Sequence, residues 1–351
     1  MNLAELLDRH LPAFYRTYGD RCTPSMQQAI DAIQRCHTAS CGHSRWQCMH
    51  CDLQEEHPLS CGHRSCPRCQ HQTTRQWLAR QQTKLLPVDY FMVTLTLPCQ
   101  LRSLAWRHQA QVYRAMFRVA AGLLKDFAAR SPRMGDDIGF TAVLHTHSRK
   151  LDYHPHLHLV VPGGSYDPRR RHWRKIRQRY LFNARALARV WRARLLAALR
   201  DEAGLVLPSA LPEQWVVDCR RVGRGLPALQ YLSRYLYRGV LPERNILGEN
   251  AGLVTFRYRD SQSGQPHTRT LPAVQFLWLV LQHVLPKGFH RLRDYGFLRG
   301  NAQVRLQRIQ LLLQVTPTPP DDTPPPRPLC PCCHLPMLWA GVRAARPPTL
   351  G

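Results

Sequence analysis

The segment Tyr153–Val161, with the sequence YHPHLHLVV, constrains the fold of this chain more than any other. From Leu157 onward four of five residues are apolar, which predicts a buried strand. Side chains on a strand alternate between its faces, so His154, His156 and His158 share one face and Leu157 lies on the other. Two imidazoles held one above the other form one edge of a divalent-metal site. The alternative for this motif alone is a histidine-rich edge strand that faces solvent.

A second motif, LQYLSRYLYR, follows about seventy residues later. Its leucines and arginines favour a helix, and Pro227 lies just upstream, where the first turn tolerates proline. Tyr231 and Tyr235 are four residues apart and therefore share one helix face, whereas Tyr237 lies well round from them. A tyrosine hydroxyl is a nucleophile that can form a phosphodiester with a DNA 5′ end. The alternative is an amphipathic core helix filled with aromatic side chains.

The order of these motifs resembles that of the two-tyrosine HUH transposases of rolling-circle insertion sequences, of the insertion-sequence-91 type. The resemblance extends through Leu144-His145-Thr146, HPHLHLVVPGG, YLSRY and HVLPKGFHRLRDYGFL, and SCGHRSCPRCQ is similar to the zinc-binding region of that family. Together these segments cover roughly residues 30 to 315. Relaxases also carry the two histidines, but their tyrosine precedes them, whereas here the tyrosines follow. The resemblance implies cleavage and joining of single-stranded DNA through a 5′-phosphotyrosine.

The fold class that follows is α+β. The resemblance implies an HUH endonuclease core, an antiparallel sheet flanked by helices with a ferredoxin-like or RRM-like strand order, preceded by a small zinc-binding module. The β-rich run 90–98 is expected to lie beside the histidine strand. The run 138–147 is expected to pair with the histidine strand in an antiparallel hairpin.

The family reaction assigns Tyr231 and Tyr235 as the catalytic residues and His156 and His158 as ligands of one Mg²⁺ or Mn²⁺. Imidazole alone does not select Mg²⁺, so an oxygen donor should complete the ligand shell. Gln230 is the candidate for that donor. His145 contributes only if the hairpin register places it opposite the histidine pair.

Seven of the thirteen cysteines lie between Cys36 and Cys69. Without a signal-peptide core at the N-terminus, a cytoplasmic location is expected, nucleoid-associated when DNA is bound, and in a reducing compartment cysteines favour metal over disulfides. The two C-x-x-C pairs predict one structural Zn²⁺ bound by Cys48, Cys51, Cys66 and Cys69. The remaining candidates for a second zinc are Cys36, Cys41, His43, Cys61 and His63.

A net charge of +26 indicates a polyanionic partner, and the 49 basic residues include only five lysines. Arginine matches phosphate oxygens and stacks on bases, which fits single-stranded DNA at element ends and targets. No apolar stretch is long enough for a membrane span. The densest charge run predicts DNA contacts with Trp173 as a stacking surface. Its candidate residues are Arg169, Arg170, Arg171, Trp173, Arg174 and Arg177, and the alternative is a solvated loop.

Four segments are therefore expected: N-terminal helices at 1–35, the zinc-binding module at 36–72, the catalytic domain at 85–315, and a Pro-rich linker with a Cys-rich, disordered tail at 316–351. In that tail, Cys330, Cys332, Cys333 and His334 offer either half of a zinc knuckle or a free metal-reactive end. Two other functions fit parts of the pattern. A replication initiator shares the chemistry, and a zinc-dependent DNA-binding regulator needs neither the histidine pair nor the tyrosine pair.

Overall fold

The computed structural model describes residues 1–69, 71–135, 137–176, 180–236, 240–260, 263–316 and 326–345. The chain forms two compact units. The first combines Met1–Thr74, Tyr237–Val284 and Asp321–Gly351, and the second combines Arg75–Leu236 with Leu285–Pro320. Residues 246–281, which form three strands and a helix, lie within the segment expected to be the catalytic domain at 85–315, and in the structure they belong to the first unit. No described helix is long and apolar enough to cross a bilayer.

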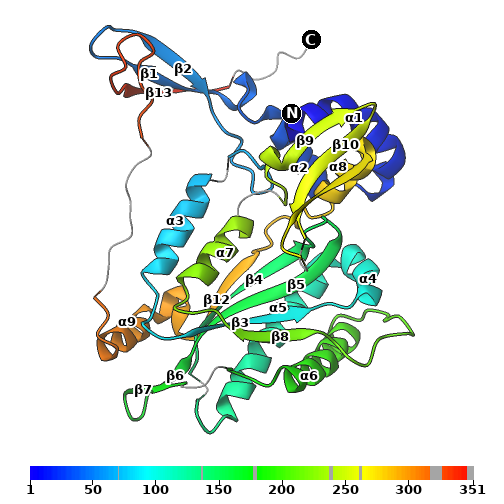
Figure 1. Ribbon diagram of the computed structural model, residues 1–351, viewed down its shortest axis with the longest axis vertical. Coiled ribbons are helices and arrows are strands. Elements are labelled where there is room, and N and C mark those ends of the chain that lie inside the picture. The colour runs from blue at the N-terminus through cyan, green and yellow to red at the C-terminus, as the bar shows by residue number, and fades with distance from the viewer. Residues whose placement is uncertain are drawn as a thin grey trace. The chain divides into compact units, whose positions relative to one another are not determined.

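The described part of the first unit contains helices α1, α2 and α8 and two small sheets (Figure 1). Its elements are α1 (Leu3–Tyr18), α2 (Pro24–Arg35), β1 (His43–Gln47), β2 (Gln54–Pro58), β9 (Ile246–Asn250), β10 (Leu253–Arg259), β11 (Pro266–Pro272), α8 (Ala273–Leu281) and β13 (Leu338–Arg343). Thr23 caps α2 and Pro24 occupies its first turn, as expected for a helix restart there. One sheet has the order β11-β10-β9 and the other β13-β1-β2.

Helix α1 packs against a segment of the first unit that lies far away in the sequence, the segment that contains α8. Its buried face, which includes Leu7 and Phe14, packs near α8, and the ring of Tyr18 stacks on Trp278 with centroids 4.7 Å apart. The guanidinium of Arg21 lies over the same indole at 4.1 Å. These contacts explain why residues near position 278 belong with the N-terminus.

The second unit is built on a five-stranded antiparallel sheet. Its elements are α3 (His71–Gln82, which begins in the first unit), β3 (Tyr90–Thr96), α4 (Arg102–Arg107), α5 (Gln109–Ala129), β4 (Phe140–His147), β5 (Tyr153–Pro162), β6 (Gly164–Asp167), β7 (His172–Lys175), α6 (Ala184–Ala197), β8 (Val217–Arg221), α7 (Leu226–Leu236), β12 (Leu292–Tyr295) and α9 (Gln303–Leu312). The strand order is β12-β4-β5-β3-β8, and every neighbouring pair is antiparallel. The four strands β8-β3-β5-β4 follow the βαββαβ order of a ferredoxin-like fold, as expected.

The sheet has one fully apolar face. Strands β3, β4 and β5 alternate, so that Val93, Leu144 and Leu157 are buried in the main core together with α5 and α6. The described buried side chains of α7 lie outside that core, and α7 contacts β4 on the other side of the sheet in Figure 1. The histidines of β5 point to this second face because they alternate with the core leucines.

The Cys-rich tail is ordered over 326–345, which corrects the expectation of disorder for that part of 316–351. Strand β13 pairs with β1 from His43↔Arg343 to Gln47↔Leu338, with a bulge at Arg45/Trp46. A sheet ladder supplies the tail with backbone hydrogen bonds that a free Pro-rich segment would lack. Strand β13, the last strand that the structure describes, is thereby part of the same sheet as the β1–β2 hairpin.

Candidate metal centre and tyrosine helix

Three histidines gather on the open face of the ferredoxin-like sheet. Strands β4 and β5 pair in a register that places His145 opposite His156. One ring nitrogen from each of His145, His156 and His158 lies within 4.8 Å of the others. The hairpin register therefore places His145 opposite the histidine pair, as its contribution to the site required. The predicted pair of His156 and His158 becomes a group of three histidines. Three imidazoles so close together fit a divalent transition-type ion such as Mn²⁺.

Hydrogen bonds orient the two motif histidines. The Nδ1 of His156 donates to the backbone oxygen of His154 at 2.7 Å. The Nδ1 of His158 lies 3.1 Å from the hydroxyl oxygen of Thr94 on β3. In the tautomer in which both Nδ1 atoms carry hydrogen, both Nε2 lone pairs are available to a metal. Such second contacts fix the ring orientation of metal-binding histidines.

Burial keeps this group neutral. Desolvation lowers the pKa of His156 to about 4 and the pKa of His158 to about 3, and it lowers the pKa of His145 well below its usual range. The neighbouring imidazoles add to each shift, because two positive charges so close together repel each other. A neutral imidazole is the form that binds a metal, so the ligands do not have to lose protons near pH 7.

His154 has a different partner, although it shares the alternation of His156 and His158. Its Nδ1 lies 2.7 Å from a guanidinium nitrogen of Arg102 at the start of α4. Burial and this positive charge lower the pKa of His154. Among the described residues it is not a member of the histidine group, which leaves it as a natural control.

Thr94 is a positioning residue that the sequence did not reveal. We expect Thr94→Val to reduce the affinity for Mn²⁺ by about 10- to 100-fold, because the hydrogen bond between the Thr94 hydroxyl and the His158 ring is lost. Calorimetric titration near neutral pH measures this change. Thr96→Val is the matched control, since the Thr96 hydroxyl donates to the Val216 oxygen rather than to a histidine. Equal Mn²⁺ affinity in both variants would remove Thr94 from the site.

Helix α7 carries the tyrosine motif and contacts β4, the strand of His145. The backbone of α7 is described through Leu236, so positions 231 and 235 are four residues apart within one helix. The side chains of Tyr231 and Tyr235 lie outside the described residues, and their shared face remains a prediction from helix geometry. The side chain of Gln230 is exposed on the same helix. Tyr237 lies outside the described residues.

The arginine-rich run is a short hairpin, β6–β7, with Arg169, Arg170 and Arg171 exposed in its turn. Asp167 caps this turn by accepting from the backbone nitrogens of Arg169 and Arg170. Two residues of the run make internal contacts instead. The Trp173 ring meets Phe297 edge-on at 5.8 Å, and the Arg174 guanidinium donates to the Met134 and Pro132 oxygens. Arg177 lies outside the described residues.

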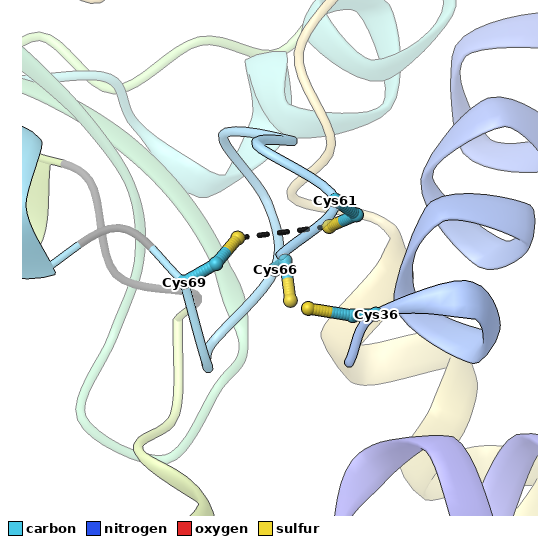
Figure 2. A group of neighbouring side chains, drawn as sticks. All are labelled: Cys36, Cys61, Cys66 and Cys69. Atoms are coloured by element: carbon cyan, nitrogen blue, oxygen red, sulfur yellow. Dashed lines mark hydrogen bonds between the residues drawn. The ribbon is translucent and has the colours of Figure 1, made fainter. Parts of the chain in front are cut away.

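The zinc-binding module contains one four-cysteine group at Cys36, Cys61, Cys66 and Cys69. Figure 2 shows the four thiols pointing toward one another, with Cys61 and Cys69 sulfurs 3.6 Å apart. Hydrogen bonds from the Cys61 and Cys66 thiols lower the pKa of Cys69 well below its usual range. Four sulfur ligands in this arrangement fit a structural zinc ion.

The predicted zinc site of Cys48, Cys51, Cys66 and Cys69 is wrong. Cys48 and Cys51 lie in the turn between β1 and β2, whereas Cys36 and Cys61 lie beyond the open end of that hairpin. Five paired residues separate the two ends by about 17 Å, too far for one ion. Cys48 and Cys51 instead group with Cys330 and Cys333.

Of the further zinc candidates, Cys36 and Cys61 belong to the first group, and Cys41, His43 and His63 belong to neither group. The Cys41 thiol donates to the Arg35 oxygen, and the His63 Nδ1 accepts from the Ser65 backbone nitrogen. The spacing Cys330-x-x-Cys333 is a third C-x-x-C pair, and it was the signal that could have identified the partner of Cys48 and Cys51.

Two family models match this chain, and both describe transposases. A family model described as a putative transposase matches residues 139–305, which hold both the histidine and the tyrosine motifs. A second model, described as a transposase zinc-binding domain, matches residues 6–97. The first match contains the three-histidine group, and the second contains the four-cysteine group of Cys36, Cys61, Cys66 and Cys69.

The relatives identify the family. The putative transposase y4qJ of Sinorhizobium fredii is 31% identical over 370 residues, 95% of this chain and 92% of the relative. The transposase of insertion sequence element IS801 from Pseudomonas savastanoi pv. phaseolicola is 28% identical over 304 residues, 81% and 70% of the two chains. The chain belongs to this family of IS91-type transposases.

A solved structure of the conjugative relaxase TrwC with a mutant oriT DNA is 18% identical and covers 64% of this chain and 74% of the relaxase. The TM-score of that match is 0.28, which is too low to carry an argument.

Proposed function

We propose that this transposase nicks and rejoins single-stranded DNA by transesterification, with a tyrosine of α7 as the nucleophile. The observation that carries the proposal is the position of the tyrosine helix. It contacts β4, whose His145 lies opposite His156 on the face that gathers the three histidines. A nucleophile and a metal centre on one side of one sheet are what a phosphodiester exchange requires.

The proposed step exchanges one phosphodiester bond for another. The tyrosine oxygen attacks phosphorus, the bond from phosphorus to the 3′ oxygen breaks, and the proton of the tyrosine ends on the released 3′-OH. The 5′-phosphotyrosine keeps the bond energy, so a 3′-OH can reverse the reaction without ATP. Two tyrosines four residues apart on one helix would allow two strand ends to be held at once.

The histidine group fits a catalytic ion. Mg²⁺ or Mn²⁺ bound there would draw negative charge from the scissile phosphate. Three neutral imidazoles favour Mn²⁺ over the harder Mg²⁺, which prefers oxygen ligands. An oxygen donor such as Gln230, together with phosphate oxygens, would complete the shell for either ion.

Binding of the DNA rests on charge more than on single contacts. The net charge of +26 and the exposed arginines of the β6–β7 turn suit a phosphate backbone. Because Trp173 and Arg174 pack internally, Arg169, Arg170 and Arg171 carry the proposed contact in this hairpin. The same charge makes the affinity fall steeply as salt concentration rises.

The test is whether the purified full-length chain becomes covalently attached to a labelled single-stranded oligonucleotide. The oligonucleotide should carry an end of the element, and the reaction should contain Mn²⁺ or Mg²⁺. A labelled band that survives denaturation and disappears after protease treatment is the expected result. A zinc-dependent regulator without catalysis would bind the same DNA and give no such band.

A further inference from the structure

We propose that Cys48, Cys51, Cys330 and Cys333 bind a second structural zinc ion, which links the C-terminal segment 326–345 to the β1–β2 hairpin. The second site lies partly outside both matched family regions, since residues 326–345 fall beyond 6–97 and 139–305. It does not depend on the proposed DNA chemistry.

The sulfur positions carry the assignment. The Cys48 and Cys333 sulfurs lie 3.4 Å apart, the Cys51 and Cys330 sulfurs lie 3.5 Å apart, and all four sulfurs lie within 4.8 Å. A disulfide needs about 2.05 Å, so neither pair is bonded. Zinc with four sulfurs at about 2.3 Å places them roughly 3.8 Å apart, close to the distances observed.

Both cysteine pairs occupy tight turns of the kind that present two thiolates to one ion. The Cys48 backbone nitrogen donates to the Leu53 oxygen at 2.9 Å, which closes the turn of the β1–β2 hairpin. In the tail, the Cys330 nitrogen donates to the Leu335 oxygen at 2.9 Å. Each turn contains one C-x-x-C pair, and two such knuckles form a tetrahedral site.

The strands around the site are too short to hold it by packing alone. Strands β1, β2 and β13 have 5, 5 and 6 residues, and the buried cluster beneath them consists of Cys48, Cys330 and Met337, with Trp46 partly buried. A core this small does not stabilise a three-stranded sheet. Metal ions replace the missing core in modules of this size. Two of the three buried residues are themselves proposed ligands, which fits that role.

Zinc content of the full-length protein, purified without chelator, tests the second site. We expect two zinc ions per wild-type chain by elemental analysis, and one in Cys330→Ser with Cys333→Ser. Cys48→Ser with Cys51→Ser should also leave one, and all four substitutions together should still leave one, because they remove the same ion. Cys332→Ser is the matched control, because Cys332 is exposed and lies outside the four-cysteine group. This variant should keep two zinc ions per chain.

A second measurement does not depend on how the cysteine variants fold. A protease site inserted within residues 317–325 of the full chain allows the tail to be cut off after folding. The cut tail should stay bound to the wild-type protein and separate when a chelator removes zinc. Each of four results would overturn the proposal. They are one zinc ion in the wild type, two ions retained by the Cys330/Cys333 variant, loss of both ions from that variant, and release of the cut tail while zinc is still bound.

Discussion

Replacing His156 and His158 together by alanine should reduce nicking of single-stranded DNA by roughly 1,000-fold or more. Both imidazoles have a partner at Nδ1, so in the tautomer with hydrogen on Nδ1 each would have its Nε2 available to the proposed ion. An ion that stabilises charge on the phosphate is worth several kcal/mol, and about 4 kcal/mol corresponds to roughly 1,000-fold in rate. Nicking of a labelled oligonucleotide in Mn²⁺ measures the loss.

DNA affinity separates loss of the ion from loss of the fold. The double variant should bind the same oligonucleotide with nearly wild-type affinity, because phosphate contacts by arginine dominate binding. His154→Ala is the matched control: the residue lies on the same strand with the same alternation, but its ring contacts Arg102. Undiminished nicking by the double variant, or equal loss in the control, would contradict the metal assignment.

The sequence predicted the sheet well because alternation is a local property. Leu157 and Leu159 mark the core face of β5, and the histidines between them must then point to the other face. The ferredoxin-like order rested on the family resemblance, since strand order depends on packing far apart in the sequence. The structure agrees with it in the pairs β3–β5, β4–β5 and β3–β8.

The role of His145 could not be predicted because register depends on the turn. Residues 148–152 close the β4–β5 hairpin with Leu151 in the left-handed region at φ 68, which leucine rarely adopts. The Ser148 nitrogen donates to the Asp152 oxygen at 2.9 Å across this turn. A shift by one residue would have placed His145 on the core face.

The cysteine pairing failed for a related reason. The C-x-x-C pairs and the isolated cysteines can be combined into four-cysteine zinc sites in several ways. What excludes the predicted combination is the length of the β1–β2 hairpin, which keeps Cys48 away from Cys66. Composition also gave a wrong expectation for residues 326–345, because the Pro-rich stretch before Cys330 is typical of disordered segments. Backbone pairing of β13 with β1 is a long-range contact that composition does not encode.

Replacing Tyr231 and Tyr235 together by phenylalanine should abolish the covalent adduct. Each change removes one hydroxyl and keeps the ring, so the free energy of unfolding should change by about 1 kcal/mol or less per site. The variant should therefore remain folded and bind DNA, yet give no labelled band after denaturation, because the nucleophile is lost. Tyr237→Phe is the control and should still form the adduct, since position 237 is rotated well away from the shared face of Tyr231 and Tyr235 on a helix.

Mass spectrometry of the trapped peptide decides which hydroxyl reacts. The nucleotide should be found on Tyr231 or Tyr235 of helix α7, and single variants can still react where one tyrosine replaces the other. Metal binding offers an independent check, because the double variant keeps all three histidines and should bind Mn²⁺ like the wild type. A nucleotide on Tyr237, or an adduct that persists in the double variant, would show that the shared face of Tyr231 and Tyr235 does not supply the nucleophile.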